Sequence, residues 1–399
     1  MSVVGSQQQV FLRLLRQLSP DWRRDFNLPQ RIQHLLARDR AFGSRDRRLY
    51  RELIYTTLRY LPWIEPALER DPARAAKIAA WLAAETRDTR AYRAELCADW
   101  PAVASLPERA KFLEGDASAL LPAWFRAECP EVFAPAELEA QLARAPLWLR
   151  LQTDDPEGVA ADFDVNGWRF TPSVLLPSAW QVPGEVDVTK SSSYANGQFE
   201  VQDLGSQMIL ETVGIAPGGR WLDACAGAGG KSLQLAHLLG STGRVDAYDI
   251  RPAALAELQA RAVRARMGNL HTLAQLPTGE YDGVLVDAPC SGSGTWRRSP
   301  HLKWVTTPAL IATRAELQQK LLSHYAARVR VGGQLVYATC SLSHRENAAI
   351  VQGFLAAHRE FEVAPFAQTF GFTPGDAGLT LLPARHDTDG FFVASLRRR

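Results

Sequence analysis

Two cysteines stand where strands are expected to end and turns to begin. Cys290 follows the apolar, β-branched run 281–286, in the segment Asp-Ala-Pro-Cys-Ser-Gly. Pro289 fixes its own φ and biases the residue before it toward extended geometry, which presents the thiol on a stiff turn. Cys340 follows a second such run, 334–338, in the segment Ala-Thr-Cys-Ser. Because ligands bind outside the carboxyl ends of strands in an open parallel sheet, the pattern predicts that both thiols face one crevice.

The other roles that cysteines have in proteins fit this sequence less well. A lone cysteine is usually a small buried hydrophobe, and this is the interpretation of Cys97 and Cys129. Five unevenly spaced cysteines in 399 residues favour a reducing compartment over a disulfide framework. No cysteine has a second cysteine or histidine at zinc-ligand spacing, so we predict no metal site. Reactive thiols are the leading interpretation of Cys290 and Cys340.

A glycine-rich turn predicts a nucleotide-like cofactor. It follows an expected strand at 221–224 and precedes a helix, so its backbone can approach a ligand and the helix N-terminus can face an anionic group. Asp249 ends the next expected strand, about twenty residues on, where a carboxylate can bind ribose hydroxyls. The turn alone leaves a dinucleotide and S-adenosylmethionine both open. Its residues are Cys225, Ala226, Gly227, Ala228, Gly229, Gly230 and Lys231.

The paired thiols favour S-adenosylmethionine. Carbon-5 of a pyrimidine is too weakly nucleophilic to take a methyl group directly, but a thiolate added at carbon-6 makes it an enamine-like nucleophile. A second thiol nearby can assist the later elimination. Because a free cysteine has a pKa of about 8.5, the attacking thiol needs loop amides, a helix N-terminus or a nearby cation.

Six segments of the sequence resemble those of a known family. They are VQDLGSQ (201–207), DACAGAGGK (223–231), YDI (248–250), DAPCSGSGTWRRSPHLKW (287–304), ATCS (338–341) and DGFFVASL (389–396). Together these segments resemble the RNA (cytosine-5) methyltransferase family, the bacterial RsmB-type enzymes and their Nop/Sun relatives. The resemblance covers about residues 199–399. The sequence departs from it where Gly227-Ala228 replaces the usual alanine-proline, and where no acidic residue lies between 270 and 279.

The resemblance implies roles for individual residues. It makes Cys340 the nucleophile, Cys290 the group that assists release, and Asp287 a residue at the meeting point of cofactor and cytosine. The glycine-rich turn and Asp249 would contact S-adenosylmethionine. The substrate implied is RNA, with ribosomal RNA expected and transfer RNA left open.

Two arginine-rich segments are candidates for RNA contact. Residues 38–51 hold six arginines against two aspartates. A solvated helix face with local ion pairs and a phosphate-binding patch are about equally consistent with this run. The resemblance favours RNA contact for the basic residues after Cys290 as well. The predicted RNA-binding residues are Arg45, Arg47, Arg48, Arg297, Arg298 and Lys303.

The rest of the chain indicates the domain organisation, and the sequence leaves rival interpretations of the function. We predict a helical NusB-like RNA-binding domain over 1–145, a small α+β connector over 146–200, and a doubly wound Rossmann-like α/β methyltransferase domain over 201–399. A net charge of +2 and no bilayer-length apolar run predict a cytoplasmic monomer without a global basic field. The rivals are a methyltransferase acting on DNA or protein, and an RNA-binding assembly factor that has lost turnover.

Overall fold

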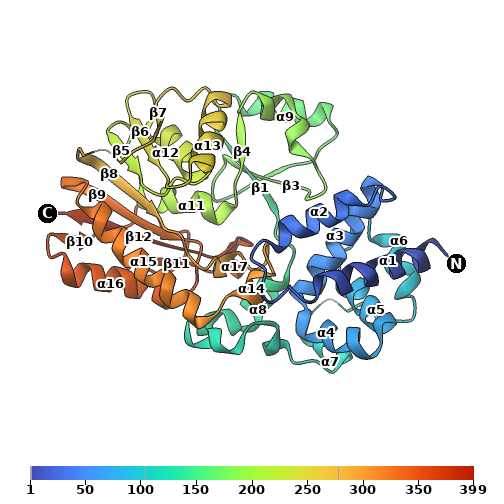
Figure 1. Cartoon of the computed structure of the whole chain (residues 1–399). Helices are drawn as coiled ribbons and strands as arrows, with labels where there is room; N and C mark the ends of the chain where they lie inside the picture. The colour runs from blue at the N-terminus through green and yellow to red at the C-terminus, as the bar shows by residue number, and fades with distance from the viewer. Residues whose placement is uncertain (1, 104, 277) are drawn as a thin grey trace. The chain divides into compact units, whose positions relative to one another are not determined.

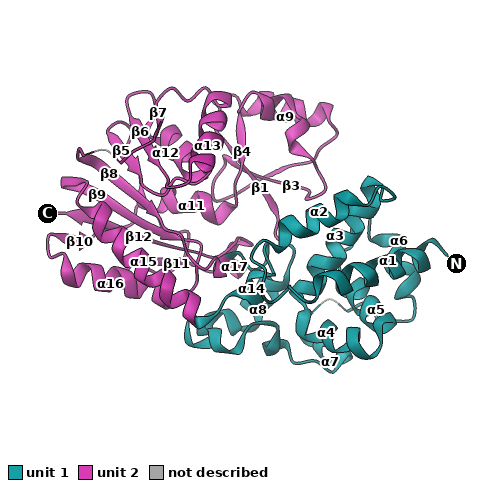
Figure 2. Cartoon of the chain, in the orientation of Figure 1, with its two compact units in different colours: residues 1–144, 295–308 teal, residues 145–294, 309–399 magenta. Residues whose placement is uncertain are grey.

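The computed structural model describes residues 2–103, 105–276 and 278–399, and the chain divides into two compact units (Figures 1 and 2). Unit 1 holds the residues up to 144 and the segment Thr295–Pro308. Unit 2 holds Ala145–Gly294 and Ala309–Arg399. The sequence predicted three domains. The structure instead groups the connector with the α/β domain and assigns a piece of a catalytic-domain motif to the helical unit.

Unit 1 is built from short helices whose first turns carry recognisable start signals. Ser105 and Glu108 form a reciprocal capping box, and Ser2 accepts a hydrogen bond from the backbone N–H of Gly5. The apolar stripes of these helices form a buried core. The helices are α1 (Val3–Leu18), α2 (Leu28–Arg38), α3 (Ser44–Arg59), α4 (Leu61–Arg70), α5 (Pro72–Leu82), α6 (Arg90–Leu96), α7 (Leu106–Leu113), α8 (Pro135–Leu142) and α14 (Leu302–Val305).

Local sequence patterns predict Ser44 and Ser206 as helix N-caps, and in the structure both caps lie earlier in the chain. Ser44 was expected to cap α3, but Gly43 holds that position, and its N–H donates to the carboxylate of Asp46. Ser206 was expected to cap the helix before the glycine-rich turn. The cap is Asp203, whose carboxylate accepts from the N–H of Gly205.

A small antiparallel sheet opens unit 2. Its strand order is β2-β3-β1-β4, and its core packs the aromatic rings of Phe163, Trp180 and Phe199 around Leu149. The strand predicted from the alternation of leucines near residue 147 is confirmed as β1. The elements are β1 (Leu147–Leu151), α9 (Pro156–Val165), β2 (Thr171–Pro172), β3 (Ala179–Val182), α10 (Ser192–Ala195) and β4 (Phe199–Val201).

The larger sheet of unit 2 has the order β10-β12-β9-β8-β5-β6-β7, with β11 paired to β12. The neighbouring strands β9, β8, β5, β6 and β7 run parallel to one another, and β12 pairs antiparallel with β9. Its elements are α11 (Leu204–Val213), β5 (Arg220–Asp223), α12 (Gly230–Leu239), β6 (Arg244–Tyr248), α13 (Pro252–Arg264), β7 (Leu270–Leu273), β8 (Tyr281–Asp287), α15 (Pro308–Ala326), β9 (Val329–Thr339), α16 (Ala348–Ala357), β10 (Phe361–Val363), β11 (Leu379–Leu381), α17 (Pro383–His386) and β12 (Phe391–Arg398).

Helices cover both faces of the larger sheet (Figure 1). The buried residues of α11, α12 and α13 form one core cluster with the strands, and those of α15 and α16 form another. This arrangement confirms the predicted doubly wound α/β fold. Neighbouring β8 and β9 both end at the same edge of the sheet, with Asp287 opposite Ala338.

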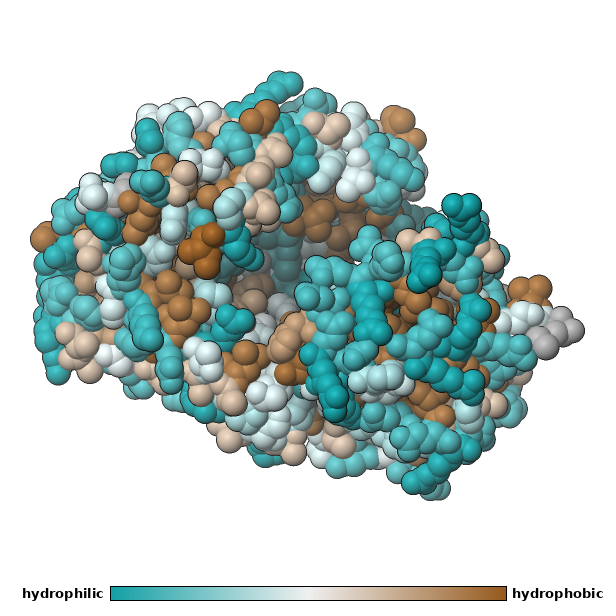
Figure 3. Space-filling model, viewed as in Figure 1, coloured by the Kyte–Doolittle hydropathy of each residue, from teal (hydrophilic) through white to brown (hydrophobic). Residues whose placement is uncertain are grey.

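The outer surface is dominated by hydrophilic side chains, with hydrophobic ones scattered among them on the face shown in Figure 3. Among the helices of the described residues, none combines the length and the apolar character needed to cross a membrane.

Candidate active site

The two cysteines that the strand pattern placed at one sheet edge are in contact. The sulfur atoms of Cys290 and Cys340 lie 3.4 Å apart, and both residues are half-buried free thiols. The register of β8 with β9 explains the contact between the sulfurs. Ala288 N–H donates to the carbonyl of Ala338 at 2.9 Å, just before the two loops begin. Each thiol therefore leaves its strand next to the other.

The environment of Cys290 favours its neutral form. The hydrogen bond to Cys340 raises the pKa of Cys290 well above its ordinary value, and burial and the charges of Cys340 and Glu346 add to this effect. Cys290 is therefore a thiol that can donate its proton toward the neighbouring sulfur.

A lysine supplies the positive charge near this pair. Lys231 Nζ lies 2.8 Å from Asp287 Oδ2, and its side chain is only 10% exposed. Burial works to lower the pKa of Lys231, but the charge and hydrogen bond of Asp287 outweigh it, and the charge of Cys340 adds to the net rise. Lys231 was predicted as part of the cofactor turn. Its ion pair instead ties that turn to the end of β8.

A buried carboxyl group joins the two cysteine loops from beneath. Glu346 is fully buried, and its Oε1 accepts from the N–H of Ser291 at 2.8 Å and from Nε2 of Gln318 at 3.0 Å. Its Oε2 accepts from the hydroxyls of Ser291 and Ser341, the latter at 2.6 Å. These serines directly follow Cys290 and Cys340, so one side chain fixes the residue after each thiol.

Further hydrogen bonds connect the two cysteine loops. Asn347 Nδ2 donates to the carbonyl of Ser341 at 2.8 Å, and its Oδ1 accepts from the hydroxyl of Thr339 at 2.6 Å. The hydroxyls of Ser293 and Ser341 lie 2.9 Å apart, and Gly294 N–H donates to the carbonyl of Cys340 at 2.9 Å. A buried hydrogen-bond network of this kind, whose Glu346 oxygens are all paired, favours a single geometry of the two loops.

Sequence reasoning missed this network. The sequence predicts only that a helix begins at His344, Arg345 and Glu346, with Glu346 and Asn347 near its first turn. A 3-10 helix does span His344–Glu346, and α16 follows with Asn347 as its N-cap. One signal was available: each cysteine is followed by a serine, and a serine hydroxyl beside a reactive thiol needs a buried partner. Nothing in the spacing identified Glu346 as that partner, because its contact with Ser291 spans 55 residues.

The glycine-rich turn has the backbone geometry expected of a ligand loop. Gly227 and Gly229 have φ of 55° and 90°, which disfavour any other residue. A Cβ on Gly229 would lie 2.0 Å from Leu258 Cδ1, so this glycine also allows close packing of the turn against α13. The turn leads directly into α12, which starts at Gly230. These features fit an adenosine cofactor at the helix N-terminus.

Asp249 orders the same turn. Its Oδ2 accepts from the N–H of Gly227 at 2.8 Å, and both of its oxygens accept from Arg251. The hydrogen bond from the Arg251 side chain is the main cause that lowers the pKa of Asp249. Asp249 is thus a carboxylate at the tip of β6, held by the turn it faces. Its contact with ribose hydroxyls stays a prediction.

A second carboxyl group lies below the turn. Asp223, at the end of β5, is 1% exposed and accepts from the hydroxyl of Ser232 at 2.6 Å. Burial raises its pKa to about 7, with the charge of Asp287 acting in the same direction. Burial likewise raises the pKa of Cys225 far above its ordinary value, so this third cysteine of the site is an unreactive thiol.

Asp249→Ala is expected to weaken the binding of S-adenosylmethionine. The substitution removes an acceptor from the predicted ribose hydroxyls and from Gly227 N–H, and hydrogen bonds to a charged group contribute about 1.5–3 kcal/mol. We therefore expect a dissociation constant raised roughly ten- to hundredfold in calorimetric titration. Asp154→Ala, which removes an exposed carboxylate of the same unit, is the control. An Asp249→Ala protein that binds the cofactor like wild type would remove this residue from the cofactor site.

Two of the predicted RNA-binding residues are buried inside unit 1. Arg297 is 0% exposed and donates to the carbonyl of Arg144 at 3.3 Å. Lys303 is 1% exposed, and its Nζ donates to the carbonyls of Arg59 and Leu120 at 2.8 and 3.1 Å. Both side chains hold the segment after the cysteine motif to the helical unit. Their burial contradicts the predicted contact with RNA.

The other predicted RNA-binding arginines lie nearer the surface of unit 1. Arg298 and Arg45 are exposed. Arg47 is half-buried and donates to the carbonyl of Leu36, and Arg48 forms an ion pair with Asp88 at 2.6 Å. These contacts agree with the local ion-pair interpretation for part of the run. RNA contact by Arg45, Arg48 and Arg298 stays a prediction.

Comparison with known proteins identifies the relatives of this fold. Residues 211–397 match the model of the family described as 16S rRNA methyltransferase RsmB/F. A ribosomal RNA small subunit methyltransferase B from Xylella fastidiosa is 34% identical over 304 residues, which cover 72% of this chain and 70% of that protein. The protein of the same name from Vibrio cholerae is 33% identical over 66% of this chain and 61% of its own length.

A solved structure gives the same fold. The crystal structure of PH0851 has a TM-score of 0.76 and covers 100% of both chains at 21% sequence identity. The curated relatives extend further than the matched regions: this chain spans about half the length of several of them.

Proposed function

Because the chain belongs to the RsmB/F family of 16S rRNA methyltransferases, we propose that it methylates carbon-5 of a cytosine in ribosomal RNA through a covalent adduct on Cys340. The observation that carries the proposal is the 3.4 Å contact between the sulfurs of Cys290 and Cys340. Methyl transfer to a nitrogen or a hydroxyl needs no such pair. Addition to a pyrimidine uses one thiol as nucleophile, and a second thiol beside it can assist the reversal.

S-adenosylmethionine is the cofactor that the family and the fold imply. Bound to the chain, it supplies a methyl group on a positively charged sulfur. The turn 225–231 and Asp249 would hold it, since the positive φ of Gly227 and Gly229 lets the backbone approach a ligand. Asp287, paired with Lys231, connects this turn to the cysteine edge of the sheet.

In the first step the Cys340 thiolate forms a bond to carbon-6 of the cytosine. The electron pair of the ring double bond moves toward carbon-5, which becomes the nucleophile for the methyl group that S-adenosylmethionine would supply. Lys231 is the cation near this pair, and the charge of Cys340 adds to the rise in the pKa of Lys231. Cys290, as a neutral thiol, donates a hydrogen bond to the attacking sulfur.

In the second step a base removes the proton from carbon-5, the ring double bond returns, and Cys340 leaves as a thiolate. The hydrogen bond to Cys340 and its charge both raise the pKa of Cys290. Both influences end once the Cys340 sulfur is bonded to carbon. Burial and the charge of Glu346 remain, but with the charge of Cys340 gone the Cys290 thiol can lose its proton to solvent, and the resulting thiolate takes the carbon-5 proton as Cys340 leaves.

Mapping of 5-methylcytosine tests this proposal. Total RNA from cells with and without the protein would be separated into ribosomal and transfer RNA and sequenced after bisulfite conversion. We expect one or more small-subunit ribosomal cytosines to lose the mark without the protein and to regain it on complementation. A mark lost from transfer RNA alone would move the substrate to that class. Unchanged marks in both would favour an assembly factor without turnover.

A further inference from the structure

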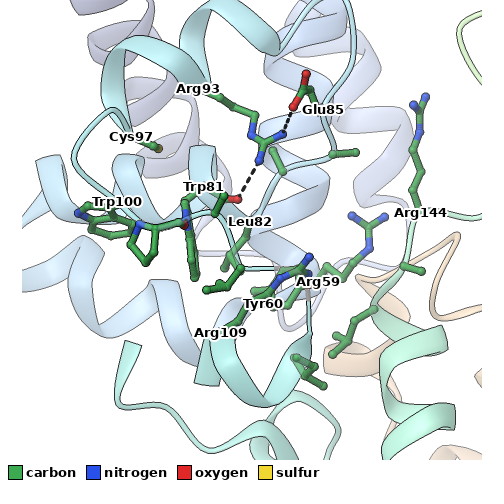
Figure 4. Close-up of a pocket in the computed structure, with 18 of the residues that line it drawn as sticks. Arg59, Tyr60, Trp81, Leu82, Glu85, Arg93, Cys97, Trp100, Arg109 and Arg144 are labelled. Atoms are coloured by element: carbon green, nitrogen blue, oxygen red, sulfur yellow. Dashed lines mark hydrogen bonds and ion pairs between the residues drawn. The ribbon is translucent and has the colours of Figure 1, made fainter. Parts of the chain in front are cut away.

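A pocket of about 720 Å³ lies within unit 1, away from any residue assigned a role above. It is formed where α3 and α5 end, beside α6 and α7 and the residues that follow α8 (Figure 4). Its volume falls in the range of about 300–1,000 Å³ that small-ligand sites occupy. The volume therefore admits a ligand the size of a nucleotide.

The charges of the pocket are unbalanced. Five arginines line it, against two glutamates. One of the glutamates, Glu85, is already shared, because it pairs with Arg90 at 3.2 Å and with Arg93 at 3.6 Å. The arginines are Arg59, Arg90, Arg93, Arg109 and Arg144, and the second glutamate is Glu139.

Arg59 is the most unusual of these side chains. It is 6% exposed, and among the described residues its Nε has no hydrogen-bond partner. One of its other nitrogens donates to the carbonyl of Arg297 at 3.3 Å. Burial lowers the pKa of Arg59, the charge of Glu52 opposes this effect, and the charge of Arg144 adds to it. A buried guanidinium without a carboxylate in contact is costly unless an anion meets it.

Arg109 and Arg144 extend this positive wall. Arg109 donates to the hydroxyl of Tyr60 at 3.3 Å, and the pKa of Tyr60 responds to the charges of both Arg109 and Arg59. Figure 4 shows Arg59 and Arg109 beside Tyr60, while Arg93 and Glu85 pair on another wall. On this side Glu52 pairs with Arg144 at 3.7 Å, and Glu139 acts on the pKa of Tyr60, so three arginines face two carboxylates.

We propose that this pocket binds the phosphate group of a nucleotide, with Arg59, Arg109 and Arg144 as its phosphate-binding residues. Guanidinium groups match the oxygens of a phosphate in pairs, and several of them suit a group with more than one charge. Trp81 and Trp100 line the same pocket and favour a ligand that carries a planar ring. The proposal does not depend on the methyl transfer proposed above, since no residue of unit 2 lines this pocket.

The test uses probes that neither the cytosine site nor the cofactor site is built for. Uridine 5′-monophosphate, uridine, inorganic phosphate and an oligouridylate would each be titrated into the full chain at low salt by calorimetry. We expect the monophosphate to bind and uridine to bind at least tenfold more weakly. Binding of the oligouridylate alone, lost on substitution of the same arginine, would identify the phosphate as that of an RNA strand.

Arg109→Gln removes one charge of the wall without touching the buried Arg59. The substitution is expected to weaken the binding of the phosphate-bearing probe at least tenfold, and Arg109→Lys is expected to recover part of that affinity. Arg74→Gln is the matched control, because Arg74 is an exposed arginine of α5 outside the pocket. Unchanged affinity for S-adenosylmethionine would show that the variants are folded. Equal affinities of Arg109→Gln and Arg74→Gln for every probe, or no binding by any probe, would overturn the proposal.

Discussion

Cys340→Ala is expected to abolish methyl transfer without leaving any covalent adduct, whereas Cys290→Ala is expected to accumulate RNA bound to Cys340. The difference follows from their places in the site. In the proposed mechanism Cys340 makes the bond to carbon-6, and Cys290 is required for the step in which that bond breaks. Loss of a covalent nucleophile lowers turnover by several orders of magnitude. The measurement is a denaturing gel of each variant after incubation with RNA and S-adenosylmethionine.

The control for this pair is Cys129→Ala, which removes a buried thiol of unit 1. It should turn over like wild type and show no trapped species. An adduct with Cys340→Ala, or normal turnover by that variant, would refute its assignment as nucleophile. Free release of product by Cys290→Ala at the wild-type rate would leave Cys290 without a role in elimination.

Glu346→Ala is expected to lower both stability and turnover. The substitution leaves the N–H of Ser291 without an acceptor among the described residues, at a cost of about 1–3 kcal/mol. The space left by the side chain adds to this cost. The serines after both cysteines are then no longer tied together, so the distance between the thiols is no longer fixed. Urea unfolding would report the stability, and single-turnover kinetics the methyl transfer.

Glu346→Gln is the matched variant for this prediction. It keeps one oxygen for Ser291 N–H and Gln318, and the two serine hydroxyls can rotate to accept from its amide. We expect it to retain most of the stability and a larger share of the turnover than Glu346→Ala. Affinity for S-adenosylmethionine should be unchanged in both, because the network holds the cysteine loops and not the glycine-rich turn. Wild-type stability and turnover in Glu346→Ala would contradict the role of the network.

The sequence predicted the parts of the site that local patterns determine. Apolar β-branched runs located β8 and β9, and the rule for strand ends then brought Cys290 and Cys340 to one edge. The glycines before α12 were predicted from the same strand-to-helix logic. Each of these features depends on residues close in the chain, where spacing determines geometry.

Long-range contacts escaped prediction. The segment Thr295–Pro308 belongs to the helical unit through contacts such as Trp304 Nε1 to the carbonyl of Leu58, 246 residues away. Basic residues in that segment therefore looked like surface charges, although Lys303 is buried against backbone carbonyls. Glu346 was missed for the same reason. Whether a charged side chain is buried depends on which distant backbone segment contacts it, and the spacing of residues in the sequence does not show this.

The most direct measurement of the central claim is proton release from carbon-5. RNA carrying tritium at carbon-5 of its cytosines would be incubated with the protein and S-adenosylmethionine labelled with carbon-14 in the methyl group. Substitution at carbon-5 through an adduct on Cys340 predicts one tritium released to water for each methyl group transferred. Methyl transfer to the RNA with the tritium retained would place the methyl group on another atom and contradict the account.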